Sequence, residues 1–221
     1  MRYVLGRIFS TLLFGLLLFA SAGRIDWVRA WVYVGAVLAG ELLTAAVLRA
    51  VNPVVLERRG RMGADAKTYD RVFVALWLVL AFVTPVVAGL DVGRSGAARV
   101  PLAGMYAGLA VMLLAYLLGA WAMAVNKHFE LLVRIQNDRE HRVVTSGPYR
   151  IVRHPGYLAA IVGALAAPLI LGSLWAFVPV VAGALLFTAR TALEDRTLRE
   201  ELAGYEEYAA RTRHRLLPGI W

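Results

Sequence analysis

The chain has 221 residues, of which 60% are hydrophobic and 18% are charged, and it contains no cysteine. A soluble domain usually has about 45–50% apolar and about 25% charged residues, so this composition excludes an ordinary soluble globule. The absence of cysteine excludes a disulfide scaffold, a thiolate metal site and a cysteine nucleophile. The formal net charge of +9 could suggest a nucleic-acid partner. In so apolar a chain we expect anionic lipid head groups instead, and no nucleic acid.

Four stretches of the chain are long and apolar enough to cross a bilayer, which takes about 20 residues as an α-helix. They extend over residues 3–22, 27–51, 72–90 and 102–125. The first could also be a signal peptide, because Arg2 and Arg7 precede an apolar run. Its length, and the very short turn before the second stretch, favour a retained membrane helix.

A fifth apolar stretch, residues 157–189, has a length that fits neither one span nor two. Its 33 residues would make a helix of about 50 Å, against a hydrocarbon core of about 30 Å. Helix-breaking residues lie near its middle, namely Pro168, Gly172, Ser173 and Pro179. We predict a hairpin of two short or tilted helices. The alternative is one steeply tilted, kinked helix.

The cations are sorted by loop, and this sorting predicts the orientation of the chain. Six lie in residues 49–71, six in 127–153 and six in 190–215, which makes 18 of the 24. The positive-inside rule then places both large loops and both termini in the cytoplasm, provided that the last apolar stretch returns to the side it left. Topology therefore also favours the hairpin.

Residues 191–211 combine leucines and tyrosines at helical spacing with many charges, which predicts an amphipathic helix with a bend near Gly204. The predicted fold is an all-α integral membrane protein in one domain, 1–221, with five to six membrane helices. Its parts are four transmembrane helices in 1–125, a cytoplasmic segment 126–157, a membrane hairpin 158–190 and an amphipathic cytoplasmic C-terminus 191–221.

The segment 126–157 holds three of the four histidines, and a connection of this length is expected to be functional or disordered. His128, His141 and His154 are spaced thirteen residues apart with no thiolate partner, so we predict no metal site. The chain also lacks a nucleophile elbow, a dinucleotide-binding glycine loop and a Walker motif. The alternative interpretation is a solvated loop without chemistry.

A hairpin brings its two ends together, so the residues at those ends should be neighbours. Residues 153–157, with the sequence Arg-His-Pro-Gly-Tyr, precede it, and Arg190, Glu194 and Asp195 follow it. Such a site offers a guanidinium for a carboxylate or phosphate, and carboxylates and tyrosine faces for an ammonium or sulfonium. The alternative is interfacial anchoring, in which arginines snorkel and tyrosines form an aromatic belt.

At these residues the sequence resembles the isoprenylcysteine carboxyl methyltransferases and their bacterial relatives, which are integral membrane enzymes that use S-adenosylmethionine. The resemblance covers residues 134–221. It rests on the sequence from His141 to Tyr149, the Arg-His-Pro-Gly-Tyr element, Arg190 with Glu194-Asp195, and the closing residues 215–219. The phospholipid N-methyltransferases share the Arg-His-Pro element and a later acidic pair, so the motif does not identify the methyl acceptor.

The resemblance implies that S-adenosylmethionine is the cofactor and S-adenosylhomocysteine its product, and it implies roles for individual residues. The cofactor-binding residues would be Gln136, His141, Arg142, Val143, Val144, Tyr149, Arg153, His154, Pro155, Gly156, Tyr157, Glu194 and Asp195. Arg190 would face the acceptor's carboxylate, and Arg190, Glu194 and His154 would be the catalytic residues. This chain has Glu194-Asp195 where the family commonly has two glutamates.

The chemistry of the acceptor remains open between two classes. A carboxylate is already nucleophilic at neutral pH and needs only orientation by an arginine fork. An amine or thiol, in a phospholipid or a small molecule, would need a proton removed, with His154 or Glu194 as candidates. In both cases we expect a lipophilic acceptor that enters from the bilayer of a bacterial inner membrane, with the active site facing the cytoplasm.

Glu41 is a further candidate for a functional residue. An ionisable side chain in the middle of a membrane span costs free energy, so its presence there suggests a function. It could bind the acceptor by lining a channel that opens to the lipid, or pair with a basic group on another helix. Two hypotheses in which the protein is not an enzyme also remain. A transporter would need polar residues in several spans, and a lipid-binding anchor would bind no cofactor.

Overall fold

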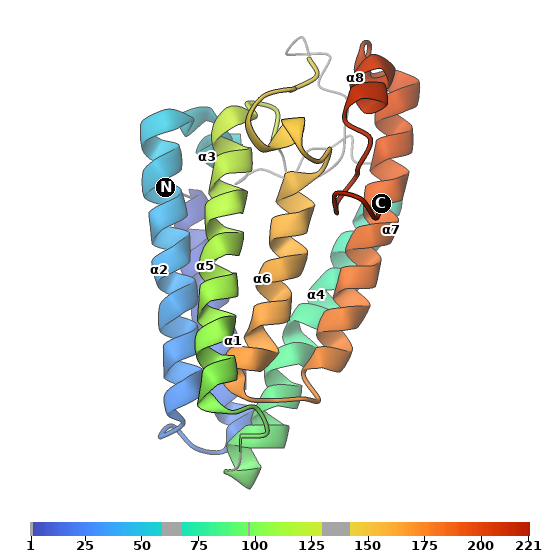
Figure 1. Cartoon of the computed structure of the whole chain (residues 1–221). Helices are drawn as coiled ribbons and strands as arrows, with labels where there is room; N and C mark the ends of the chain where they lie inside the picture. Colours follow the sequence, from blue (N-terminus) through green and yellow to red (C-terminus); the bar gives the residue numbers. More distant parts are fainter. Residues whose placement is uncertain (1, 59–67, 97, 130–141) are drawn as a thin grey trace.

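The computed structural model describes residues 2–58, 68–96, 98–129 and 142–221 (Figure 1). The structure in these ranges is helical and contains no strand. In chain order the elements are α1 (Arg2–Ala22), α2 (Val28–Val51), α3 (Pro53–Arg58), α4 (Thr68–Ala88), the π-helical turn η1 (Gly89–Gly93), α5 (Leu102–Val125), the 3₁₀-helix η3 (Gly147–Arg150), α6 (Pro155–Leu171), α7 (Phe177–Glu201) and α8 (Tyr205–Arg211).

The long helices form a bundle, with the short elements α3, η3 and α8 gathered at one of its ends (Figure 1). Within the described residues, five helical segments are long and apolar enough to cross a membrane, and α6, with 17 residues, is a shorter apolar helix. The predicted all-α integral membrane fold is therefore confirmed. The end that carries α3, η3 and α8 also carries the described residues of the three cation-rich segments, and we refer to it as the basic end.

For the first four predicted spans, the helix boundaries agree with the prediction except in α4. This helix begins at Thr68, four residues before the predicted start, and continues through η1 to Gly93. The apolar window excluded the first turn because it contains Asp70 and Arg71. In the structure Asp70 is nevertheless fully buried, so the first turn of α4 belongs to the packed bundle.

The predicted hairpin is present, and the alternative of one kinked helix is wrong. Helix α6 ends at Leu171 and is capped by Gly172, which has a left-handed φ of 84° and donates its N–H to Pro168 O at 2.9 Å. Ser173 follows and accepts the N–H of Ala176 on its Oγ at 3.1 Å, just before α7 begins. A left-handed glycine that closes the last turn is a usual way to end a helix sharply.

Helix α7 continues without a break to Glu201, across the boundary predicted at residue 190 between the hairpin and the C-terminus. The change from apolar to charged composition at this position therefore does not end the helix. The amphipathic region 191–211 therefore comprises the last turns of α7 and the separate α8. The bend predicted near Gly204 is confirmed, since Gly204 has a φ of 79° and precedes α8.

Small residues allow the membrane helices to approach closely. A Cβ at Gly108 of α5 would lie 2.9 Å from Leu169 Cβ of α6, and Gly119 and Gly163 continue this contact along the two helices. A Cβ at Gly89 would lie 2.7 Å from the carbonyl oxygen of Leu18, so η1 also packs directly on α1. Lipid offers no hydrophobic drive between helices, so this close packing is what holds the bundle together.

Candidate functional site

Asp195 of α7 lies at the centre of a buried ionic network at the basic end. Arg153 binds it through two parallel hydrogen bonds, Nε to Oδ1 at 2.7 Å and Nη2 to Oδ2 at 3.0 Å. Tyr205 Oη at 2.9 Å, Arg215 Nε at 3.0 Å and Arg199 Nε at 3.3 Å donate to the same carboxylate, and His154 Nε2 lies 3.5 Å from its Oδ1. Most of the sites at which the Asp195 carboxylate can accept a hydrogen bond are therefore occupied by donors of the protein itself.

Tyr205 is a neutral donor in this network. Burial, and then the adjacent Asp195 carboxylate, raises the pKa of the Tyr205 hydroxyl far above its ordinary value. The hydroxyl consequently stays protonated and donates to Asp195. Since Tyr205 is the first residue of α8, this bond attaches α8 to α7.

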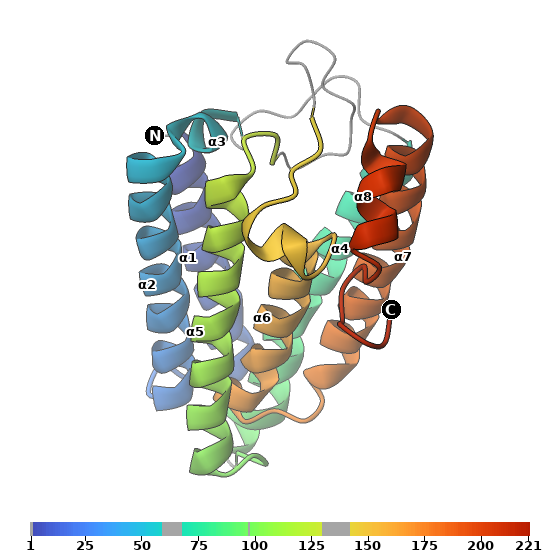
Figure 2. The same cartoon turned by 45° about the horizontal axis from the view of Figure 1, so that its top comes forward.

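The C-terminal segment lies against the start of α6. The backbone N–H groups of Arg153 and His154 donate to the carbonyls of His214 and Arg215, both at 2.9 Å. The Nη1 of Arg153 adds bonds of 2.8 Å to the carbonyls of Thr212 and Arg213. Figure 2 shows α8 and this segment folded back beside α7. Arg153 thereby joins α6, α7 and the C-terminal segment.

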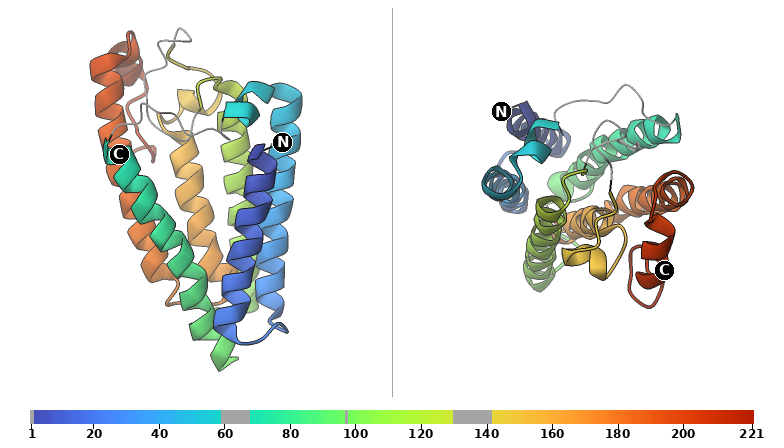
Figure 3. Two further views of the ribbon diagram at one scale, coloured as in Figure 1. Left: turned by 180° about the vertical axis from the view of Figure 1, so that it is seen from behind. Right: turned by 90° about the horizontal axis from the view of Figure 1, so that it is seen from above.

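Tyr157, in the first turn of α6, connects two other predicted residues. Its hydroxyl donates a hydrogen bond to Glu194 Oε2, and its ring stacks on the His154 ring with centroids 5.7 Å apart and planes 5° apart. The guanidinium of Arg190 lies over the same ring, 5.0 Å from its centroid. Seen from above, α6 lies between α5 and α7, which brings the two hairpin ends together (Figure 3). The predicted juxtaposition of these residues is present.

Arg190 is paired with an acid that the sequence did not single out. Its Nη2 lies 2.7 Å from Oδ1 of Asp70, and the side chains of the two residues are 5% and 0% exposed. The Phe73 ring, one turn after Asp70 on α4, lies 4.4 Å from the guanidinium carbon. An acid in the first turn of a membrane helix is a signal that could have identified Asp70, because such a residue needs a partner.

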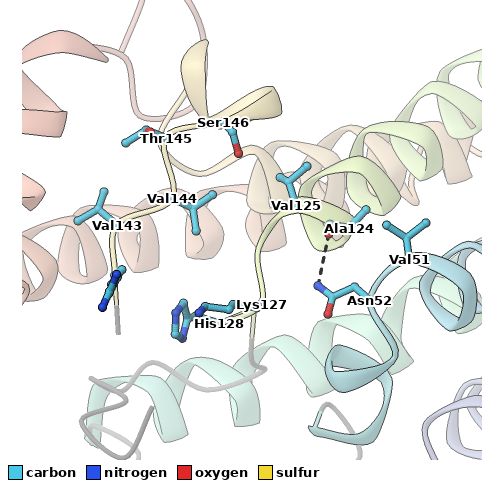
Figure 4. A pocket seen from close by; sticks show the side chains of 11 residues that line it. Val51, Asn52, Ala124, Val125, Lys127, His128, Val143, Val144, Thr145 and Ser146 are labelled. Atoms are coloured by element: carbon cyan, nitrogen blue, oxygen red, sulfur yellow. Dashed lines mark hydrogen bonds between the residues drawn. The ribbon is translucent and has the colours of Figure 1, made fainter. Parts of the chain in front are cut away.

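A cavity of about 510 Å³ opens at the basic end, between the ends of α2 and α5 and the chain that precedes η3 (Figure 4). Its volume lies within the usual range for ligand sites, roughly 300–1,000 Å³. The lining residues are Val51, Asn52, Ala124, Val125, Lys127, His128, Arg142, Val143, Val144, Thr145 and Ser146. Sequence reasoning had identified Arg142, Val143 and Val144 but not the other polar members.

Asn52 shapes this cavity by bridging two helix ends. Its side-chain amide donates to the carbonyl of Met123 at 2.9 Å and to that of Ala124 at 3.4 Å, so the end of α2 is fixed to the end of α5. Figure 4 shows the second of these bonds. Asparagine at the end of a span gave no distinctive signal in the sequence, because its partners come from a distant helix.

The cavity wall and the Asp195 network share one apolar cluster. Val143 and Val144 pack against a buried cluster that includes Tyr149 and Tyr205, and Tyr205 in turn binds Asp195. Tyr149 is held by its hydroxyl, which accepts the amide of Asn126 at 3.0 Å. The predicted residues before and after η3 therefore belong to one packed unit.

Pro155 and Gly156 form the start of α6 and position the residues around them. Pro155 is buried at the first helical position, where its missing N–H costs nothing. The Phe129 ring covers Gly156 so closely that a Cβ there would lie 2.6 Å from it. Gly156 is therefore required for the contact between Phe129 and α6.

Two of the predicted cofactor residues, Gln136 and His141, lie outside the described residues. Arg153 and Asp195 bind each other, so we expect them to position the site instead of contacting the cofactor through their charged atoms. In the ranges that the structure covers, no group of three or more His, Cys, Asp or Glu side chains is arranged to hold a metal ion.

Glu41 is buried in α2 and pairs with Arg7 of α1, and Tyr116 of α5 donates to the same carboxylate oxygen at 3.5 Å. The structure thus provides the basic partner that one of the two interpretations required. Among the described residues, the contacts of Glu41 are to α1 and α5 and not to the hairpin ends. Its role in binding an acceptor remains a prediction.

Part of this chain is similar to proteins described as methyltransferases. Residues 108–200 match the model of the isoprenylcysteine carboxyl methyltransferase (ICMT) family. Two proteins of Oryza sativa, from subspecies indica and japonica, are each described as "Probable protein-S-isoprenylcysteine O-methyltransferase". Each is 28% identical to this chain over 127 residues, which cover 52% of this chain and 61% of the rice protein. The family resemblance drawn from the motifs is confirmed over the matched residues.

Proposed function

We propose that this protein is an integral membrane methyltransferase that uses S-adenosylmethionine and methylates the carboxylate of a lipophilic acceptor. The observation that carries the proposal is the position of Tyr157, which contacts Glu194, His154 and Arg190 at one partly buried point where the hairpin ends meet. The match of residues 108–200 to a methyltransferase family supports it.

The residues at this point fit the cofactor by their chemistry. S-adenosylmethionine carries a sulfonium, an ammonium and a carboxylate, and when bound it would supply an electrophilic methyl group. The Glu194 carboxylate and the faces of Tyr157 and His154 suit the cationic groups. Arg142, at the cavity rim, and the neighbouring hydroxyls of Thr145 and Ser146 suit the anionic group.

Arg190 is the residue that we assign to the acceptor. A guanidinium binds a carboxylate through two parallel hydrogen bonds, which fixes the oxygen that attacks. Because a carboxylate is already ionised at neutral pH, the protein needs to supply alignment and a dry site and no general base. The family name and the names of the rice proteins support isoprenylcysteine as the kind of acceptor.

The proposal also includes the orientation of the protein in the membrane. The site lies at the basic end of the bundle, where the positive-inside rule places the cytoplasm. A lipophilic acceptor would reach it from the bilayer, and the soluble cofactor would reach it from the cytoplasm. The protein would thus reside in a bacterial inner membrane, with its active site on the cytoplasmic side.

Calorimetric titration of the purified protein with S-adenosylmethionine tests the cofactor assignment. Saturable binding should be lost or strongly weakened in Glu194→Ala and His154→Ala. It should be unchanged in Glu200→Ala, a matched control whose acid is exposed on the same helix. Absence of binding by the wild-type protein, or equal binding by all variants, would overturn the proposal.

Transfer of label from cofactor to lipid extracts tests the acceptor assignment. A carboxylate acceptor gives a base-labile methyl ester, whereas a methylated amine or thiol is stable to base. Arg190→Lys keeps a cation beside Asp70 but loses the planar fork, so it should retain cofactor binding and lose ester formation. Base-stable product from the wild-type protein would show that the acceptor is not a carboxylate.

A further inference from the structure

We propose that Arg29 binds the phosphate group of a membrane phospholipid, at the end of the bundle opposite the basic end. Arg29 lies in the first turn of α2, outside residues 108–200 that match the family model. The turn between α1 and α2, the loop after η1 and the turn between α6 and α7 lie together at this end, which we call the turn end (Figure 1). The inference does not depend on the methyl transfer proposed above, because that site lies at the basic end.

The guanidinium of Arg29 has no hydrogen-bond or ion-pair partner among the described residues. Its Nη1 atom is enclosed by the protein, since a Cβ at Gly172 would lie 2.8 Å from this atom and also 2.8 Å from Ala98 Cβ. The edge formed by Nε and Nη2 is not enclosed in this way. Arg153 uses the same edge to bind both oxygens of Asp195. Arg29 therefore offers an open guanidinium edge to an anion that carries two oxygens.

Both aspartates of the turn end are paired with other arginines. Arg24 binds Asp26 through two hydrogen bonds, Nε to Oδ1 at 2.6 Å and Nη2 to Oδ2 at 2.9 Å. Arg99 Nε donates to Asp91 Oδ1 at 3.1 Å. Among the described residues at this end, no acid remains for Arg29. The positive charge of Arg29 is therefore not compensated within this part of the structure, and it attracts an anion.

The start of α2 adds to the attraction for an anion. The first turn contains no acid, and Trp27, which precedes the helix, provides no side-chain cap. The first N–H groups of a helix have no partners within it, and they form the positive end of the helix dipole. The indole N–H of Trp27 is itself buried without an acceptor among the described residues. The unpartnered groups at this helix start are thus donors, which suits a negatively charged acceptor.

The side chains around Arg29 indicate that the anion belongs to a lipid and is not a free ion. Val28 and Trp31 of α2 are exposed, and so is Trp175 in the turn between α6 and α7. Tryptophans gather at the membrane–water interface, at the depth of the lipid head groups. A guanidinium at this depth can bind a phosphate through two parallel hydrogen bonds, while the acyl chains contact the exposed apolar side chains.

A lipid bound here would stabilise the contact between segments that are distant along the chain. The backbone N–H of Arg99, in the loop after η1, donates to the carbonyl of Gly172 at 2.9 Å. Arg29 joins α2 to the same place, since its guanidinium lies beside Gly172. A ligand that binds only the folded arrangement stabilises it according to its affinity and concentration. Phospholipid should therefore raise the melting temperature through Arg29.

The test uses a fluorescent reporter at the turn end, so that lipids bound at the basic end do not contribute to the signal. Because the chain has no cysteine, bimane attached to Ile25→Cys places one fluorophore in the exposed turn before Arg29. The labelled protein, purified in a non-ionic detergent, is titrated with dioctanoyl phosphatidylglycerol. The fluorescence change should be saturable. Its midpoint should move to a lipid concentration about tenfold or more higher in Arg29→Gln, which loses a charge-assisted bidentate contact.

Two control ligands separate the lipid from its parts. Dioctanoylglycerol has the same chains without the phosphate, and inorganic phosphate has no chains. Neither should give the saturable change at the concentrations at which the phospholipid gives it. Arg24→Gln is the matched control variant, because the Arg24 guanidinium lies at the same end but is already bound to Asp26. This variant should keep the midpoint of the protein with both arginines.

Melting temperatures of the unlabelled proteins give a second measurement. Arg29 makes no hydrogen bond to a described residue, so Arg29→Gln should melt as the wild type does when no lipid is added. Dioctanoyl phosphatidylglycerol should raise the melting temperature of the wild type and of Arg24→Gln more than that of Arg29→Gln. Equal midpoints with and without Arg29→Gln, or an equal response to inorganic phosphate or dioctanoylglycerol, would overturn this inference.

Discussion

Arg153 and Asp195 form a bidentate ion pair that joins the residue before α6 to the helix after the hairpin turn. Their side chains are 2% and 1% exposed, so this pair is shielded from water. Arg153 also binds two carbonyls of the C-terminal segment. One arginine thereby fixes three parts of the chain around the point where Tyr157 meets Glu194 and Arg190.

We expect Asp195→Asn to destabilise the protein by about 3–5 kcal/mol, because removing one partner of a buried pair leaves the other charge uncompensated. Cofactor affinity should fall together with stability, since Arg153 would no longer hold the start of α6. Thermal or chemical unfolding in detergent measures the first effect, and titration measures the second. Glu207→Gln, on the exposed side of α8, is the control. Unchanged unfolding of Asp195→Asn would contradict a positioning role.

Tyr157→Phe separates the hydroxyl of Tyr157 from its ring. The ring contacts with His154 and Arg190 should remain, whereas the hydrogen bond to Glu194 is lost. Hydrogen bonds to charged groups are worth about 1.5–3 kcal/mol, so we expect affinity for S-adenosylmethionine to fall by about tenfold or more. Unfolding should change less than in Asp195→Asn. An affinity equal to that of the wild type would show that the orientation of Glu194 does not matter for the cofactor.

The sequence was sufficient to predict those parts of the fold that depend on local composition. Hydropathy located the spans, and Gly172 and Ser173 located the hairpin turn. The proximity of residues 153–157 to residues 190–195 was predictable because the two helices of a hairpin begin and end on the same side of the membrane. The continuation of α7 beyond residue 190 was not predicted, because hydropathy reflects the polarity of the side chains and not the backbone hydrogen bonds that continue a helix.

Contacts between helices that are distant along the chain were not predictable in this way. Asp70 and Arg190 meet because α4 packs beside α7, and no local pattern specifies which helices of a bundle are neighbours. Asn52 escaped notice for the same reason, since its amide binds the end of α5. In both cases the burial of a polar group indicates a partner but does not identify it.

The pair formed by Glu41 and Arg7 allows a test between the two interpretations of Glu41. If its role is structural, Glu41→Ala should lower the free energy of unfolding by roughly 1–3 kcal/mol, because a charge is left unpaired. The double variant Arg7→Leu, Glu41→Leu should recover most of this loss. The KM for the acceptor should not change in the double variant. An increase in KM with unchanged stability would instead indicate that Glu41 contacts the acceptor.

Gly108 provides a test of the packing between α5 and α6. In Gly108→Ala the new Cβ would lie 2.9 Å from both Leu169 Cβ and Ile170 Cγ1, which is closer than real Cβ contacts allow. Overpacking of this kind typically costs about 1–3 kcal/mol, and we expect a lower melting temperature. Gly35→Ala, in α2, meets no atom within 4 Å and should be neutral or slightly stabilising. Equal melting temperatures for the two variants would contradict the close approach of α5 and α6.

The absence of cysteine makes the orientation directly measurable, because a single introduced cysteine is then the only thiol in the chain. Ile25, in the turn between α1 and α2, is 74% exposed, and Ile220, in the C-terminal segment, is 79% exposed. A membrane-impermeant maleimide applied to intact spheroplasts should label Ile25→Cys, whereas Ile220→Cys should react only after permeabilisation. This result would place the basic end in the cytoplasm, in accordance with the positive-inside rule. Labelling of Ile220→Cys alone in intact spheroplasts would reverse the topology and would put the cofactor site on the side without S-adenosylmethionine.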